Sequence, residues 1–113
     1  MRILAALLLL AATSSGQVSL GVGALDSNAI VVRIEGQETS ITLAGAKPGS
    51  APATAFLKCL VANRVLRIKG PHNAATALLL DDTSVADHVN EFLQSRTSMD
   101  PCALGKAAYR GPK

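Results

Sequence analysis

The chain has 113 residues, 11 of them basic and 8 acidic, which gives a formal net charge of +3 at pH 7. This length allows one small domain, and so weak a positive charge gives little support for a polyanionic partner. The aromatic residues are two phenylalanines and one tyrosine, a scarcity that argues against a surface on which single-stranded nucleic acid stacks.

The N-terminus has the features of a secretory signal peptide. Arg2 supplies a positive charge, an apolar run extends from Ile3 to Ala12, and small or polar residues follow from Thr13 to Gly16. The run is too short for a membrane-spanning helix, which needs about 20 residues. A buried first helix, the alternative, fits poorly because the run is apolar on every side. We expect residues 1–16 to be a signal peptide and the protein to be exported, periplasmic or secreted, rather than an integral membrane protein.

Two cysteines, Cys59 and Cys102, follow this leader. An even number of cysteines in an oxidising compartment favours a disulfide; two unpaired thiols are the alternative. A bridge across a loop of this length would stabilise the fold by about 4 kcal/mol in the chain-entropy model. The chain has no CxxC pair, and His72 and His88 show no zinc-ligand spacing, so we expect no metal or other cofactor.

Three strands joined by short turns are expected first. Gly21 and Gly23 indicate that the first strand is bent or bulged, and β-branched residues dominate the second. The predicted strands are Val18–Leu25, Ala29–Glu35 and Glu38–Gly45, with turns at 26–28 and at Gly36–Gln37.

Two helices and two further strands complete the predicted elements. A helical stripe follows Ser50, a plausible N-cap, and Asn63 is a plausible end. Ser84 and Asp87 resemble a capping box that opens a second helix. The stripes are Ala53, Phe56, Leu57, Leu60 and Val61, then Val85, Val89, Phe92 and Leu93; the strands are Arg64–Lys69 and Ala74–Leu80.

This order of elements predicts a mainly β fold with α-helices. Five strands with a helix between the third and fourth, followed by a C-terminal helix, are typical of the OB-fold-like five-stranded barrel. We expect this domain to occupy residues 17–96. Residues 97–113 are expected to form a partly ordered tail, in which a turn of helix is an option, held through Cys102.

Three segments resemble the staphylococcal (thermo)nuclease family. "ALDSNAIVVRIEGQETSITLAG" (Ala24–Gly45) resembles the family's opening meander, and "ATAFLKCLVANRVLRI" (Ala53–Ile68) resembles its first helix and the strand after it. "VNEFLQ" (Val89–Gln94) is similar to its V-N-x-x-L helix. The resemblance covers residues 18–96. It implies calcium-dependent phosphodiester hydrolysis, in which two aspartates hold the metal, a glutamate acts on the water and two arginines stabilise the transition state.

The residues at the positions of this machinery differ from those the family requires. The resemblance aligns the two aspartates with Asn28 and Lys47, the first arginine with Thr42 and the glutamate with Ser50. Lys47 would repel a dication, and a serine cannot replace a carboxylate base. The loop aligned with the second arginine, "GPHNAAT", contains no arginine. We therefore expect no catalytic and no metal-binding residues.

The resulting hypothesis is an exported, catalytically inactive nuclease-like domain that acts as a binding or structural module. The expected partner is a protein or a cell-envelope component. Nucleic acid is a weaker candidate, with Arg67 and Lys69 as the phosphate contacts. The alternative is a divergent nuclease that still hydrolyses nucleic acid. We interpret Asp81–Asp82 as a solvated turn and His88 as a surface residue.

Overall fold

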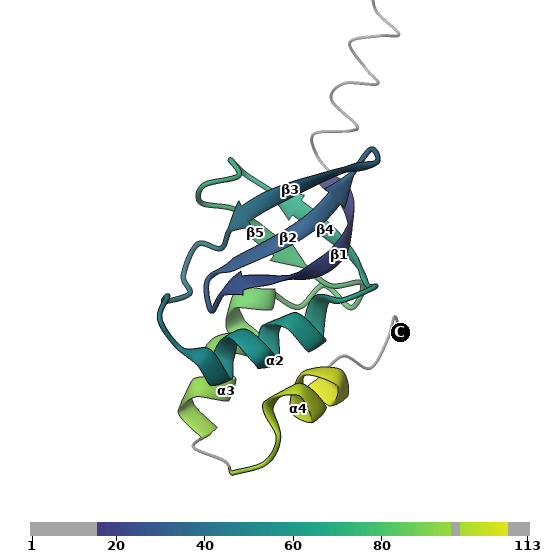
Figure 1. Ribbon diagram of the computed structural model, residues 1–113. Coiled ribbons are helices and arrows are strands. Elements are labelled where there is room, and N and C mark those ends of the chain that lie inside the picture. Colours follow the sequence, from purple (N-terminus) through teal and green to yellow (C-terminus); the bar gives the residue numbers. More distant parts are fainter. Residues whose placement is uncertain (1–15, 96–97, 109–113) are drawn as a thin grey trace, which may run out of the picture.

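The computed structural model describes residues 16–95 and 98–108 (Figure 1). The predicted signal peptide lies almost entirely outside these residues, as does Tyr109. No helix within the described ranges is long and apolar enough to cross a membrane. The elements, in chain order, are β1 (Gln17–Asp26), β2 (Ala29–Ile34), β3 (Gln37–Thr42), α2 (Ala51–Val61), β4 (Val65–Lys69), β5 (Thr76–Leu78), α3 (Val85–Ser95) and α4 (Pro101–Ala108).

The five strands form one antiparallel sheet in the order β3-β2-β1-β4-β5. The three helices are grouped on one side of it, with α2 between the sheet and α4 (Figure 1). The protein is therefore a mixed α/β domain, which confirms the predicted number of strands and the helix between β3 and β4. The core lies between the sheet and α2, where Ile30, Ile41, Leu57, Leu60 and Leu66 are fully buried.

The first strand is irregular, as its glycines predict. Its register with β2 shifts between Gly21 and Gly23 and again between Ala24 and Asp26. At Gly21 the strand bonds to the residues that follow α2: Gly21 N–H donates to the Arg64 carbonyl (2.8 Å), and Asn63 N–H donates to the Gly21 carbonyl (2.9 Å). The irregularity thus brings the strand backbone against the helix.

The hairpin between β2 and β3 turns one residue earlier than expected. Glu35 and Gly36 are its two central residues, with φ values of 51° and 82°, and Ile34 pairs with Gln37 across the turn. Positive φ at both central residues is the conformation favoured in two-residue hairpin loops, because it matches the twist of the strands. Gln37 therefore begins β3 and does not belong to the turn.

The helix α2 forms as the sequence predicts. Ser50 is its N-cap and accepts a hydrogen bond from Ala53 N–H (3.2 Å), and a proline lies in the first turn. All five residues of the predicted apolar stripe are buried. Asn63 adopts a left-handed conformation (φ 61°) two residues after the last helical residue, which is a common way to end a helix.

β3 and β5 are shorter than the expected strands Glu38–Gly45 and Ala74–Leu80, and α3 differs in its buried face. β5 is shorter, because Asp82 has a φ of 67° and its N–H donates to the Leu79 carbonyl (2.9 Å), which turns the chain. In α3, Val85 and Val89 are buried, but Leu93 is 39% exposed. Leu93 lies about 100° around the helix from its neighbour Phe92, which packs on the core.

The segment expected to be a tail forms the helix α4. Its eight residues begin at Pro101, and Asp100 accepts a hydrogen bond from Ala103 N–H (3.2 Å). Cys102 forms a disulfide with Cys59 of α2, with Cα atoms 5.2 Å apart, so the predicted bridge is confirmed. Gly105 is buried against α2, where an added Cβ would lie 2.3 Å from the Phe56 carbonyl oxygen. Pro101–Ala108 thus belong to the packed helices and not to a partly ordered tail.

Candidate functional site

The first candidate region is the turn between β1 and β2 together with the loop that leads into α2. Asp26 Oδ1 accepts hydrogen bonds from Ser27 N–H (2.7 Å) and Gly49 N–H (2.8 Å). These bonds, that from Gly49 foremost, hold the pKa of the Asp26 carboxyl below its ordinary value. Asp26 is therefore ionised, and its carboxylate holds the loop against the turn.

Ser27 completes the attachment of this loop. Its side chain is fully buried; the hydroxyl donates to the Lys47 carbonyl (2.6 Å) and accepts from Ser50 N–H (3.2 Å). A buried polar group with both roles satisfied is stabilising, whereas an unpaired one is costly. The sequence identified Ser27 only as a turn residue. Its hydroxyl bonds to Lys47 and Ser50, which lie 20 and 23 positions further along the chain.

The four positions that the nuclease resemblance singles out lie around this turn and loop. Asn28 and Thr42 lie at the adjoining strand ends: the Asn28 carbonyl accepts from Leu43 N–H (2.7 Å), and Thr42 pairs with Ala29. Lys47 has an exposed side chain, and the Ser50 hydroxyl caps α2. The four residues lie close together, and the hydrogen bonds of Asn28, Thr42 and Ser50 stabilise the strands and the start of α2. Among residues 16–95 and 98–108, no three His, Cys, Asp or Glu side chains are grouped so as to hold a metal ion.

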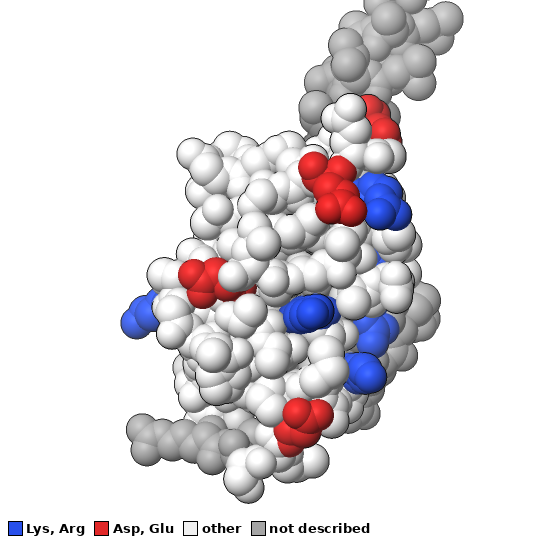
Figure 2. All heavy atoms as spheres, in the orientation of Figure 1, with Lys and Arg blue, Asp and Glu red and all other residues white. Residues whose placement is uncertain are grey.

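The two candidate phosphate contacts lie on β4. Arg67 is half-buried and forms an ion pair with Asp82 from the turn after β5. Lys69 is exposed at the end of the strand. On the face seen in Figure 2 a few basic groups lie near one another at centre right, and acidic groups lie above, below and to the left of them. This arrangement offers no extended basic surface on that face.

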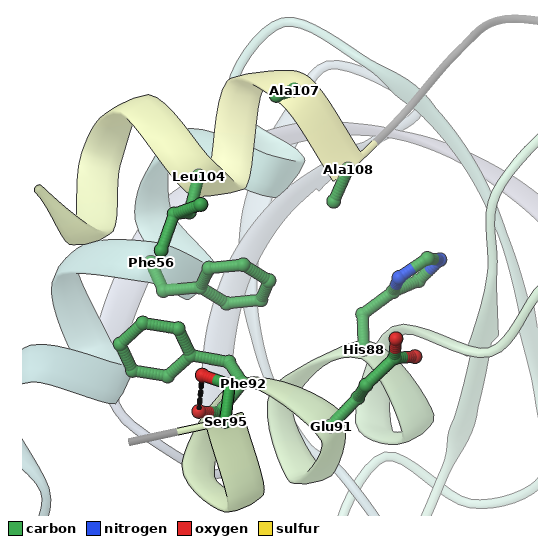
Figure 3. A pocket seen from close by; sticks show the side chains of 8 residues that line it. All are labelled: Phe56, His88, Glu91, Phe92, Ser95, Leu104, Ala107 and Ala108. Carbon is green, nitrogen blue, oxygen red and sulfur yellow. Dashed lines mark hydrogen bonds between the residues drawn. The ribbon is translucent and has the colours of Figure 1, made fainter. Parts of the chain in front are cut away.

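A groove between α3 and α4 is the second candidate region. Its cavity has a volume of about 300 Å³. Phe56 and Phe92 stack on each other beside it, with ring centroids 4.7 Å apart and planes at 17°. Figure 3 shows Ala108 pointing from α4 into the space between Phe56 and His88. The lining residues are Phe56, His88, Glu91, Phe92, Ser95, Leu104, Ala107 and Ala108. We call this cavity the helix groove.

An acidic cavity of about 270 Å³ adjoins the helix groove. The two cavities share His88 and Glu91, which lie one turn apart on α3. Carboxylates dominate the charge of this second cavity. Its lining residues are Leu78, Asp82, Thr83, Ser84, Asp87, His88 and Glu91. The pair of cavities thus has an apolar part and an acidic part along one helix.

A hydrogen-bonded chain of three side chains lies beside the acidic cavity. His88 Nε2 is 2.8 Å from Thr83 Oγ1, and the Thr83 hydroxyl donates to Asp81 Oδ1 (2.5 Å). This bond is the main reason that the pKa of the Asp81 carboxyl lies below its ordinary value. Because the single hydroxyl hydrogen goes to Asp81, His88 donates to Thr83 and does not act as its base. The three groups therefore lack the order of a nucleophile–histidine–acid triad.

Sequence reasoning missed the helix groove because it treated one wall as part of a tail. The signal that could have found that wall is the pair Asp100–Pro101: an N-cap residue followed by proline is a frequent start of a helix. The meeting of α3 and α4 has no local signal, since it depends on how both helices pack against α2.

Comparisons with known proteins give no assignment. The chain matches no family model, no curated protein and no solved structure. The function is therefore inferred from the geometry of the two candidate regions.

Proposed function

We propose that the protein is a binding module whose ligand contacts the helix groove. The observation that carries this proposal is the apolar cavity beside the stacked Phe56 and Phe92, with the polar groups of His88 and Glu91 at one end. Ligand cavities in proteins are mostly apolar and contain a few polar groups that orient the ligand. The turn and loop around Ser27 are a weaker candidate, because their polar groups bond to one another.

The proposed scaffold is an OB-fold-like barrel, in which the sheet would close between its two edge strands. Leu43 and Ala75, next to the ends of β3 and β5, form an isolated parallel bridge. Ala75 N–H donates to the Thr42 carbonyl and Ala44 N–H to the Ala75 carbonyl, both at 2.9 Å. These bonds support closure, and closure would give the five-stranded barrel expected for the nuclease-like fold.

Export of an inactive nuclease-like domain is the remaining part of the proposal. The disulfide between Cys59 and Cys102 supports an oxidising compartment, because such bridges persist in the periplasm and outside the cell. The use of Ser50 as a helix cap supports the absence of a catalytic base at that position. A phosphodiesterase remains the alternative to this binding function.

The first expected result separates these alternatives. The purified protein with millimolar calcium should cut single- and double-stranded DNA and RNA no faster than a mock preparation, because a cation at Lys47 and a hydroxyl at Ser50 replace acidic groups. Release of acid-soluble nucleotides measures the rate. Calcium-dependent cleavage that follows the protein through several columns, and is lost in Asp26→Asn but kept in Glu38→Gln, would contradict the binding proposal.

The second expected result tests the helix groove directly with indole, an uncharged aromatic probe. Indole should bind saturably with a dissociation constant on the order of 1 mM, as expected for a ligand of so few atoms. Ala108→Phe should abolish this binding, because the larger side chain would fill the cavity toward which Ala108 points. Ala103→Phe is the matched control, since Ala103 is exposed on α4 and does not line the groove.

Equilibrium dialysis measures the affinity, and far-ultraviolet circular dichroism checks that both variants are folded. Indole that binds equally well to the Ala108→Phe and Ala103→Phe proteins would place its site elsewhere and contradict the proposal.

A further inference from the structure

The two cavities adjoin each other along α3 and together form one surface. Glu91 and His88 line both of them, Phe92 and Ser95 extend the apolar side, and Ser84 and Asp87 extend the acidic side. Residues three and four apart on a helix lie on the same side of it. A ligand that enters the helix groove can therefore continue into the acidic cavity without crossing a helix.

The acidic side of this surface has charge that the residues described by the structure do not neutralise. Asp82 pairs with Arg67. In contrast, neither Asp87 nor Glu91 has an ion-pair partner within the described ranges, and α3 itself contains two acids and no lysine or arginine. Among the described residues, His88 is the one basic side chain that lines either cavity, and it bonds to Thr83. The charge of the surface is thus complementary to a cationic group.

The dimensions of the surface favour an extended peptide segment. From Ser84 to Ser95 the helix rises about 16 Å, at roughly 1.5 Å per residue. An extended chain covers this distance in about five residues, at roughly 3.3 Å per residue. A cavity of about 300 Å³ accommodates one large side chain and is at the small end of the range for whole ligands. A compact small molecule would fill one cavity and leave the other.

We propose that the helix groove and the acidic cavity bind an extended peptide segment in which a bulky aromatic side chain is followed, two or three residues later, by lysine or arginine. The aromatic side chain enters the helix groove beside Phe56 and Phe92, and the cation lies near Asp87 and Glu91. This inference rests on the proposed binding function and adds the class of the ligand.

The probe is the synthetic peptide acetyl-Ser-Trp-Gly-Lys-Lys-amide. The protein contains no tryptophan, so the emission of the peptide's indole ring reports binding without background. Its emission should shift to shorter wavelength and saturate as protein is added. A peptide with both lysines replaced by glutamate should bind at least tenfold more weakly, and an increase in salt from 20 to 500 mM should weaken the basic peptide alone, because salt screens exposed charges.

Variants of the protein locate the two contacts. Glu91→Gln and Asp87→Asn should each weaken the basic peptide by about two- to fivefold, the range for an exposed ion pair. Asp87→Asn should leave indole binding unchanged, because Asp87 lines the acidic cavity and not the helix groove. Glu38→Gln is the matched control, because it removes a carboxylate from β3, away from α3, and should change neither. Free indole should compete with the peptide, which tests shared occupancy even if Ala108→Phe fails to fold.

The outcomes separate the ligand class from the function itself. Indole binding in the groove together with equal affinity for the lysine and glutamate peptides would overturn the peptide inference and leave the binding function in place. Absence of binding by both indole and the peptide would overturn both. Self-association of the protein that free indole dissociates would assign the groove to a second copy and would also overturn the peptide inference.

Discussion

Replacement of Gly21 by alanine should lower the free energy of unfolding by about 3 kcal/mol or more, at the upper end of the range for overpacked sites. A Cβ at Gly21 would lie 1.9 Å from the Val61 carbonyl oxygen and 2.8 Å from its carbonyl carbon. Both are backbone atoms, which cannot move aside as the end of a flexible side chain can. The strand or the end of α2 must therefore shift, and the hydrogen bonds of Gly21 with Asn63 and Arg64 would be strained.

Gly23 provides the matched control on the same strand. A Cβ there would have the Lys58 side chain as its nearest neighbour, at 4.0 Å. Gly23→Ala should therefore change stability by no more than about 0.5 kcal/mol. Urea denaturation followed by circular dichroism measures both variants. Equal stability of the Gly21→Ala and Gly23→Ala proteins would show that β1 and α2 do not make the close approach described here.

Loss of the disulfide should lower the free energy of unfolding more than the loss of any single contact among the helices. The double substitution of Cys59 and Cys102 by alanine should lower the free energy of unfolding by about 4 kcal/mol, because the unfolded chain regains the freedom of the loop between them. The variant should also lose affinity for indole, since α4 supplies one wall of the helix groove.

Reduction of the native protein is the matched comparison. Dithiothreitol should lower its stability by about the same amount and should leave the double variant unchanged. Urea denaturation with and without the reductant measures this, and peptide mapping without reductant should recover one linked pair. Native protein whose stability is insensitive to a reductant that has demonstrably opened the bridge would contradict the assigned role of the disulfide.

Much of the fold was predictable because its signals are local. The β-branched residues of the second strand predicted β2, and the spacing from Ala53 to Val61 predicted the buried face of α2. The pair Gly21 and Gly23 correctly indicated an irregular strand. The turn at Glu35 was misplaced by one residue, because a non-glycine residue at positive φ is uncommon.

The parts that sequence could not supply depend on tertiary packing. α4 contains a proline and a glycine, which indicate loops when taken alone; Gly105 is there because α2 passes so close. The helix groove arises where α3 and α4 both pack beside Phe56 of α2. These three helices lie far apart in the sequence. The positions chosen through the nuclease resemblance do meet near one turn, but the role of Ser27 in bonding that loop depends on partners that only the fold brings near.

The most direct test of the binding function is to map the indole site by nuclear magnetic resonance. Amide signals of the isotope-labelled protein would be recorded as indole is added to saturation. The binding proposal predicts that the perturbed amides concentrate on α3 and α4 around His88, Phe92 and Ala108. In the Ala108→Phe variant, the signals of these amides should not shift when indole is added. Perturbations centred instead on Ser27 and the loop before α2, or spread evenly over the sheet, would contradict it.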